Sequence, residues 1–435
     1  MTSGLQSGVF ARTGAVLPGS NRPRLLLAAP YFRPAYYGGV VQVYHQLLTR
    51  LKSVESFIVC QRLGGNPEEM ERFDRAALLE CGYQVLRIER YELIFGAQAS
   101  LVERLGDTAR FLLRTRAEWR KAVREIRPDV IVCGATGIAG WLMEHLPEPI
   151  PFINYIHGEE LGEAGKSRFF RRFLFQRQLV IIRKAALNIS VSRYTASKAI
   201  ALTGISAARI ALLPNFVDED RFSPPSDREA LRRQLGWHDK KVILTLSRLT
   251  PRKGIDQSIR ALVELRREGK LTPEWIHVVA GSGEQEGELR ALTASLGVGE
   301  TTRFEGFVPD ERVPHYYGAA DIFLLPNRDL MGNTEGFGIV FLEAGACGTP
   351  VIGGIAGGTA DAIREGVTGF RVNSEDSAEI GRAVLELVND EELRHRMGVA
   401  AAEIVRREHR VETAVSSFEN LLLDVIRSEK LQKNA

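Results

Sequence analysis

Short runs of apolar residues alternate with longer amphipathic segments between residues 24 and 354 of this 435-residue chain. The runs are rich in β-branched residues and leucine and are almost continuously apolar, which predicts strands buried on both faces of a parallel sheet. The segments between them have helical patterns, and Pro128 follows the one at residues 100–125. Strands and helices in alternation predict a doubly wound α/β fold.

The predicted strands fall into two series. The first comprises residues 24–30, 56–60, 129–134, 151–158, 187–192 and 209–215, and the second comprises 241–247, 275–281, 302–308, 321–327 and 350–354. A chain of this length is too long for one ordinary core. The sequence therefore predicts two Rossmann-like domains that face each other across a cleft.

The predicted domain boundary lies after residue 214. Pro224 and Pro225 interrupt regular structure within the acidic segment 215–227, which suits a linker. We expect an N-terminal domain over residues 1–214 and a C-terminal domain over residues 215–408.

The two ends of the chain have different patterns. Residues 409–435 contain a helical stretch that could cross back to the N-terminal domain. Residues 1–20 show no core-forming period, so we expect them to be flexible. They also lack the long apolar run of a signal peptide.

Composition excludes several classes of protein. The net charge is only +3, so the chain as a whole is not a strong binder of polyanions. No stretch of ~18 apolar residues predicts a membrane-spanning helix. The cysteines have neither Cys-x-x-Cys nor zinc spacing, which favours reduced thiols in a cytoplasmic protein; they are Cys60, Cys81, Cys133 and Cys347.

The segment 166–184 combines basic residues with interleaved phenylalanines and contains no acidic residue. One interpretation is a basic amphipathic helix that touches anionic lipid at the inner face of the membrane, or an anionic acceptor. The other is a helix whose apolar side packs on the sheet and whose basic side faces solvent. The sequence leaves both open.

The glycine-rich stretch 333–358 contains the strongest candidate for a ligand site. A buried helix is expected to begin near Gly336, and its free N–H groups and dipole would suit a diphosphate. Gly336 and Gly338 would let the backbone approach the ligand. Glu335 precedes the helix, and Glu343 lies two turns further on. A buried helix that merely starts at a glycine-rich turn explains this stretch equally well.

Two cations follow a predicted strand in the segment 247–256. Arg248 and Lys253 lie at the carboxyl end of that strand, where ligands of open α/β sheets bind. Fixed cations of this kind can stabilise a diphosphate leaving group in place of a metal ion. The alternative is that both are ordinary surface cations on a loop.

In combination these motifs resemble glycosyltransferase family 4, whose enzymes have the GT-B fold. The resemblance covers most of the second domain and scattered loops of the first. The residues that carry it are EGFGIVFLEAGACGTPVI (335–352), SRLTPRKG (247–254), PNFVDEDRF (214–222), AGSGEQ (280–285), FEGFV (304–308) and YYGGV (36–40).

The resemblance implies a role for each residue of the donor site. Glu335 would bind hydroxyls of the donor sugar and Glu343 those of the ribose, while Arg248 and Lys253 would hold the diphosphate. The remaining contacts would come from the backbone of Phe337, Gly338 and Ile339, and from the loop of the first domain at Gly38 and Gly39.

The resemblance also implies that His157 lies beside the donor sugar and the acceptor. Its position at the end of a predicted buried strand agrees with that role, although a lone histidine is more often structural. The family motif Asn-Gly-Val-Asp is altered here, with Phe216 in place of the glycine, so the backbone there cannot require glycine.

Enzymes of this family retain anomeric configuration and need no metal, and no side-chain nucleophile is evident. The leaving phosphate is thought to help deprotonate the acceptor, so positioning and electrostatics supply most of the rate. No cofactor is therefore expected beyond the donor substrate. The metal-binding pattern Asp-x-Asp occurs at Asp218 and Asp220, but such short acidic patterns are frequent by chance.

Other nucleotide-binding classes fit less well. The stretch at Gly281 and Gly283 lacks the spacing of a dinucleotide loop, and the chain has no P-loop motif. The four tryptophans are better explained as packing residues than as a nucleic-acid platform; they are Trp119, Trp141, Trp237 and Trp275.

The sequence thus predicts a retaining hexosyltransferase that takes a sugar from a nucleoside-diphosphate sugar. The resemblance favours GDP-mannose slightly over a UDP-sugar, and a lipid-linked or polysaccharide acceptor. Two alternatives remain open. One is an epimerase or phosphorylase on the same scaffold, and the other is a non-catalytic subunit that binds sugar nucleotides.

Overall fold

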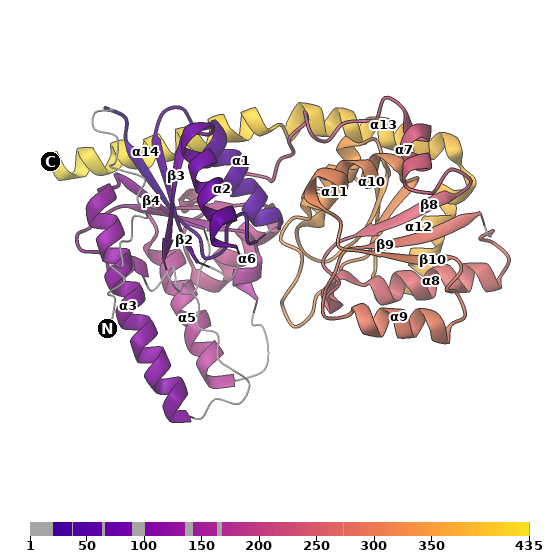
Figure 1. Cartoon of the computed structure of the whole chain (residues 1–435), viewed down its shortest axis with the longest axis horizontal. Coiled ribbons are helices and arrows are strands. Elements are labelled where there is room, and N and C mark those ends of the chain that lie inside the picture. The colour runs from indigo at the N-terminus through magenta and orange to yellow at the C-terminus, as the bar shows by residue number, and fades with distance from the viewer. Residues whose placement is uncertain are drawn as a thin grey trace.

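The computed structural model describes residues 21–36, 38–62, 66–88, 101–134, 142–162, 168–272 and 274–434. These residues form two parallel sheets, each flanked by helices, that lie side by side (Figure 1). This is the doubly wound, two-lobed architecture that the alternating pattern predicts. The predictions for residues 1–20 and for Trp141 fall outside the described residues.

The first sheet has seven parallel strands in the order β3-β2-β1-β4-β5-β6-β7. They are β1 (Arg24–Ala28), β2 (Glu55–Gln61), β3 (Tyr83–Ile88), β4 (Val130–Cys133), β5 (Phe152–Ile156), β6 (Leu187–Ser190) and β7 (Ile210–Leu212). The helices of this lobe are α1 (Gly39–Arg50), α2 (Pro67–Leu79), α3 (Leu101–Ile126), α5 (Arg168–Lys184) and α6 (Arg193–Thr203), with short 3-10 turns at η1 (Glu159–Leu161) and η2 (Ala207–Arg209).

Side chains at alternate positions of the central strand pack on opposite faces of this sheet. Leu25 and Leu27 of β1 belong to the cluster that contains Tyr44 of α1. Leu26 belongs instead to the cluster that contains Trp119 of α3. Both faces are therefore buried, which explains why these strands are continuously apolar in sequence.

The second sheet has six parallel strands in the order β10-β9-β8-β11-β12-β13. They are β8 (Lys241–Leu246), β9 (Trp275–Ala280), β10 (Thr302–Gly306), β11 (Ile322–Leu325), β12 (Val351–Gly354) and β13 (Gly369–Val372). The helices that follow the first lobe are α7 (Arg228–Gln234), α8 (Ile255–Arg267), α9 (Glu286–Ser295), α10 (Val313–Ala319), α11 (Ile339–Ala346), α12 (Ser377–Asn389), α13 (Glu391–Glu408) and α14 (Val411–Asn434), with 3-10 turns η3 (Pro251–Lys253), η4 (Asp310–Arg312) and η5 (Gly357–Asp361).

The sequence-based prediction missed two strands, β3 and β13, and both are edge strands. The sequence of β3, YQVLRI, mixes polar with apolar residues, because an edge strand has a partner on one side only. The strand β13 has only four residues, GFRV, and two of them are half-buried. Neither strand has the continuous apolar run that identified the central strands.

The chain crosses between the two lobes twice, and the two crossings lie side by side. Val217 on the first crossing donates its N–H to the carbonyl of His409 on the second, at 2.9 Å. Nδ1 of His409 in turn donates to the carbonyl of Asn215, also at 2.9 Å. Phe216 is buried. Among the described residues, only Arg127 and Met331 combine a side chain with a positive φ, so Phe216 needs no glycine-like backbone.

After the second crossing, α14 runs back over the first sheet, in yellow along the top of Figure 1. It packs against α1 and β4. The Glu419 carboxylate accepts the backbone N–H groups of Lys52 and Ser53, each at 2.7 Å. Phe418 is 2% exposed and lies within the core of the first lobe. The last helix of the chain is therefore part of the first lobe.

Three predictions about individual side chains can be compared with the fold. Trp119, Trp237 and Trp275 are buried packing residues, as expected. All four cysteines are free. Within the part of the chain that the structure describes, every helix is too short or too polar to cross a lipid bilayer.

The position of Phe418 generates a prediction about stability. Phe418→Ala should lower the free energy of unfolding by about 3–5 kcal/mol, because it removes a buried ring from the core of the first lobe. Leu431→Ala, at a 72% exposed site on the same helix, should change it by no more than ~0.5 kcal/mol. Urea titration followed by circular dichroism would compare the two variants, and equal effects would contradict the packing of α14 described above.

Candidate active site

The amino ends of two helices meet between the lobes. Helix α11 begins at Ile339 and not near Gly336 as predicted, because Gly338 precedes it with a left-handed φ of 90°. Gly39 is the first residue of α1, and a Cβ on it would lie 3.1 Å from Cγ2 of Ile339. Two sets of free N–H groups and two positive dipole ends therefore lie close together, an arrangement that suits an anionic ligand.

Beside this junction, Glu335 forms a buried ion-pair cluster with two cations. Its Oε2 accepts from Nζ of Lys253 at 2.6 Å and from the Arg252 guanidinium at 2.9 Å. Burial alone would raise the pKa of the Glu335 carboxyl, but the charges of Lys253 and Arg252 outweigh burial and lower it to about 2. The carboxylate is thus charged, and it holds both cations in fixed positions.

The turn η3 positions these cations. Both Arg252 and Lys253 are less than 10% exposed. Arg328 donates from Nε to the carbonyl of Pro251 and from its backbone N–H to that of Arg252, each at 2.8 Å. Arg328 is itself fixed by an ion pair with Asp256 at 3.0 Å.

Arg248 and Lys253 occupy different environments. Arg248 is exposed at the carboxyl end of β8. Burial lowers the pKa of Lys253, Glu335 raises it, and the charges of Arg252 and Arg248 lower it further. Arg248 therefore lies close enough for its charge to act on Lys253. Sequence analysis missed Arg252, although its position next to Lys253 was the available signal.

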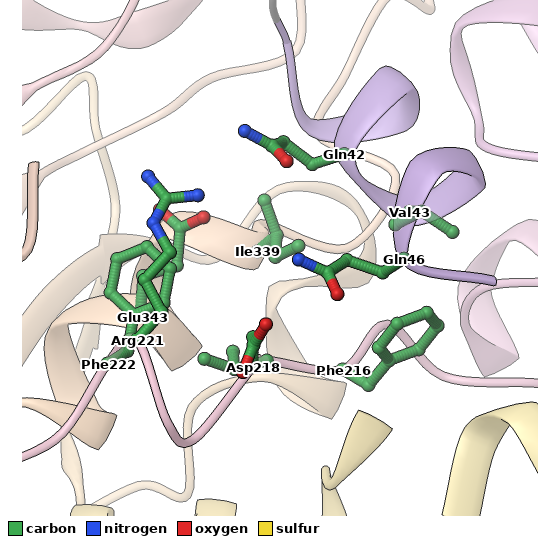
Figure 2. Close-up of a pocket in the computed structure, with 10 residues that line it drawn as sticks. Gln42, Val43, Gln46, Phe216, Asp218, Arg221, Phe222, Ile339 and Glu343 are labelled. Atoms are coloured by element: carbon green, nitrogen blue, oxygen red, sulfur yellow. The ribbon is translucent and has the colours of Figure 1, made fainter. Parts of the chain in front are cut away.

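Glu343 faces a pocket between α1, α11 and the first crossing. In Figure 2, Gln42 and Gln46 extend from α1 towards it, and Arg221 lies beside Glu343. The Tyr317 hydroxyl donates to Glu343 at 3.1 Å. Burial raises the pKa of Glu343 to about 7, although the Arg221 charge opposes the shift.

A second interlobe contact lies at Asp310, which sequence analysis did not identify. Its carboxylate accepts from Arg33 at 2.8 Å and from Gln42 at 2.7 Å, both in the first lobe, and from Arg221 at 2.7 Å. Burial alone would raise the pKa of Asp310, but the hydrogen bond and charge of Arg221, together with Arg33, lower it. No sequence motif marks Asp310, because its partners come from distant parts of the chain.

His157 directly follows β5, and its backbone contacts the second lobe. A Cβ on Gly336 would collide with the His157 carbonyl oxygen, and a Cβ on Gly158 would lie 2.6 Å from Cα of Gly336. The Ser192 hydroxyl donates to the Gly336 carbonyl at 2.7 Å. The absence of a side chain at Gly336 thus permits lobe-to-lobe contact, whereas sequence analysis had assigned it to ligand approach.

The His157 ring is almost completely buried, and burial lowers its pKa to about 3. It is therefore a neutral imidazole near pH 7. The Glu160 carboxylate accepts the backbone N–H groups of His157 at 3.3 Å and of Gly158 at 2.7 Å. Glu160 thereby holds the loop that carries the histidine.

The structure brings most of the predicted site residues to the junction between the lobes. The pairs in contact there are Gly39 with Ile339, His157 with Gly336, and Lys253 with Glu335. Gly38 is the residue that precedes α1. The Phe337 ring is 1% exposed and packs against His409, so only the backbone of Phe337 is left to contact a ligand. Glu343 lies in the neighbouring pocket, which Ile339 also lines.

The acidic pattern at Asp218 and the basic segment 166–184 both form ion pairs in the structure. Asp218 forms an ion pair with Arg50 of α1 at 2.9 Å, which gives the acidic pattern there a role between the lobes. In the described part of the basic segment 166–184, Phe175 is buried. Arg177 and Lys184 both form ion pairs with Glu144, so part of the basic side is neutralised.

Comparisons with known families agree with this geometry. Residues 37–221 match the sequence model described as Glycosyltransferase Family 4. Residues 227–404 match the model described as Glycosyl transferases group 1. Together the two matches span most of the chain and divide it where the first lobe gives way to the second.

The chain is also similar to curated glycosyltransferases. It is 41% identical over 213 residues to the GDP-mannose-dependent alpha-(1-6)-phosphatidylinositol monomannoside mannosyltransferase of Mycolicibacterium smegmatis, a match that covers 48% of this chain and 55% of the relative. It is 36% identical over 197 residues to the D-inositol 3-phosphate glycosyltransferase of Geodermatophilus obscurus, covering 44% of this chain and 42% of the relative. The matches therefore span only about half the length of these relatives.

Solved structures share the fold at lower identity. Anabaena HepE in complex with UDP and glucose superposes with a TM-score of 0.71 at 20% identity, covering 92% of this chain and 99% of HepE. The sucrose-phosphate synthase of Thermosynechococcus elongatus gives a TM-score of 0.72 at 20% identity, covering 94% of this chain and 100% of the synthase. With two parallel-sheet lobes, the matched motifs and these relatives, the chain belongs to the family 4 glycosyltransferases of the GT-B fold.

Proposed function

We propose that this glycosyltransferase moves a hexose, with retention of configuration and without a metal ion, from a nucleoside-diphosphate sugar bound between the lobes. The observation that carries the proposal is the buried cluster of Lys253, Arg252 and Glu335 beside the amino ends of α1 and α11. A diphosphate placed there would meet two fixed cations and two helix dipoles. Arg248 would add a third positive charge.

Breaking the glycosidic bond places new negative charge on the diphosphate. Glu335 already holds the cations in place, so they need little rearrangement to stabilise that charge. This is the basis of electrostatic preorganisation. Glu335 and the backbone from Phe337 to Ile339 would bind the sugar, and Glu343 would bind the ribose. The neutral His157 would form a hydrogen bond with a sugar hydroxyl.

GDP-mannose is the preferred donor and a lipid-linked or polysaccharide acceptor is the preferred partner. The names of the similar enzymes include GDP-mannose and phosphatidylinositol monomannoside, which supports this choice. A UDP-sugar is the second candidate. The segment 166–184 would provide peripheral contact with the inner face of the membrane from the cytoplasm, through its basic residues.

The cluster generates a first prediction for catalysis. Lys253→Ala or Glu335→Ala should lower the rate of transfer at least ~100-fold, because each change removes or releases a charge that stabilises the leaving group. Both variants also break a buried ion pair, which destabilises a protein in its own right. The rates should therefore be measured well below each variant's melting temperature.

A matched control separates the two effects. Arg232 and Asp321 form an ion pair at 2.6 Å whose side chains are 10% and 9% exposed, much like those of Lys253 and Glu335. Asp321 lies at the amino end of β11, whereas η3 follows the carboxyl end of the neighbouring strand β8. Arg232→Ala should cost similar stability yet keep transfer. Near-normal transfer by Lys253→Ala would refute the proposed site.

The donor can be identified by thermal denaturation. A ligand that binds only the native state, at a concentration one hundred times its Kd, adds about 2.7 kcal/mol to the stability of the protein. The melting temperature of the protein therefore rises. We expect GDP-mannose to raise Tm more than UDP- or ADP-sugars at equal concentration, and Lys253→Ala to abolish the rise. A larger shift with UDP-glucose would overturn the preference for GDP, and products formed without any acceptor would favour an epimerase or phosphorylase.

Metal independence has its own test. Transfer by the wild-type enzyme should be unchanged after EDTA treatment and gel filtration, because the cations and helix ends supply the positive charge. Loss of activity that Mg²⁺ or Mn²⁺ restores would contradict this expectation. Such a loss would favour a metal site at the carboxylates of Asp218 and Asp220.

A further inference from the structure

Tyr44 of α1 connects the His157 ring to the backbone of the first lobe. Its hydroxyl oxygen lies 2.6 Å from Nε2 of His157, and the hydroxyl donates to the carbonyl of Gly134 at the end of β4. Both tyrosine and histidine are buried. Tyr44 lies outside every motif that identified the site.

The chemistry of these three groups fixes the position of the imidazole hydrogen. A carbonyl oxygen can only accept, so the single hydroxyl hydrogen of Tyr44 is committed to Gly134. Burial raises the pKa of the Tyr44 hydroxyl well above its usual value, which keeps that hydrogen in place. The remaining contact, from Tyr44 to Nε2 of His157, can then form only if Nε2 carries the imidazole hydrogen and donates it.

The neutral state of His157 makes this constraint decisive. A neutral imidazole has one hydrogen, so a hydrogen on Nε2 leaves Nδ1 with a lone pair. Among the residues that the structure describes, none forms a hydrogen bond with Nδ1 of His157. Nδ1 of His157 is therefore left as a hydrogen-bond acceptor.

Aromatic packing holds the His157 ring in this orientation. Tyr155 stacks on His157 with ring centroids 4.5 Å apart, and Tyr44 contacts it edge-on at 5.3 Å. Behind Tyr155 lies Phe418 of α14, with centroids 6.1 Å apart. The helix that returns from the second lobe thus supports the plane of the histidine.

We infer that Tyr44 is a positioning residue that holds His157 in the Nε2–H tautomer, so that Nδ1 accepts a hydrogen bond from a sugar hydroxyl. The inference rests on the proposed function, because it assumes that a sugar reaches His157. It adds a requirement that the proposed function lacks. The histidine must act as a hydrogen-bond acceptor at this atom and not as a donor.

The first test is spectroscopic and needs no substrate. In ¹⁵N-labelled wild-type protein near pH 7, Nε2 of His157 should give the signal of a protonated, pyrrole-type nitrogen and Nδ1 that of an unprotonated, pyridine-type nitrogen. His157→Asn assigns the signals by their loss. Tyr44→Phe should yield a mixture of tautomers. An Nδ1–H tautomer in the wild type, or an unchanged tautomer in Tyr44→Phe, would overturn the inference.

The second test is kinetic. Tyr44→Phe should lower kcat/KM about tenfold, a change equivalent to ~1.4 kcal/mol, which lies in the range for one hydrogen bond. The control is Tyr83→Phe, which removes a hydroxyl that bonds Nδ1 of His45 at 2.9 Å in the same lobe. Tyr83→Phe should retain wild-type kcat/KM. Equal losses in the two variants would mean a general loss of stability and would overturn the positioning role.

These outcomes separate this inference from the proposed function. If the wild-type protein transferred no sugar from any donor, the proposed function would fail, while the spectra would still decide the tautomer. If transfer were normal in the wild type and in Tyr44→Phe despite a changed tautomer, the positioning role would fail and the proposed function would stand.

Discussion

The ion-pair cluster of Glu335 with Lys253 and Arg252 is the interaction on which the rest of the site depends. Taking three charged groups out of water is costly, and it is tolerated only where each charge has a close partner. Here the Glu335 carboxylate pairs with both cations and fixes their positions. A departing diphosphate would meet cations that are already in place, so a feature that costs stability in the empty protein would become useful on binding.

Much of the fold follows from the sequence because burial on both faces of a parallel strand leaves a continuous apolar run. Strands β1, β4 and β11 were identifiable for that reason, whereas β3 and β13 at the sheet edges were not. The candidate site divides in the same way. Glu335 and Lys253 belong to local motifs, but Asp310 and Tyr44 acquire their partners only through folding, from residues up to 277 positions away.

The glycines between the lobes illustrate how one residue type can serve different physical needs. Gly338 adopts a left-handed conformation immediately before α11 begins. Gly336 instead leaves room for the His157 carbonyl. Sequence alone assigned both to ligand approach, because it records the absence of a side chain and not what occupies the space. In the folded protein, the loop that carries His157 and the loop that carries Gly336 are in direct backbone contact.

The paired crossings at Val217 and Arg410 have a mechanical consequence. A single covalent connection would let one lobe swivel about any bond of the linker, whereas two strands joined by an N–H···O bond resist torsion. The ion pair of Glu219 with Arg410 stiffens the same place. The paired connection should therefore restrict relative motion of the lobes to bending about one axis. Each opening would then return the two helix tips to the same alignment.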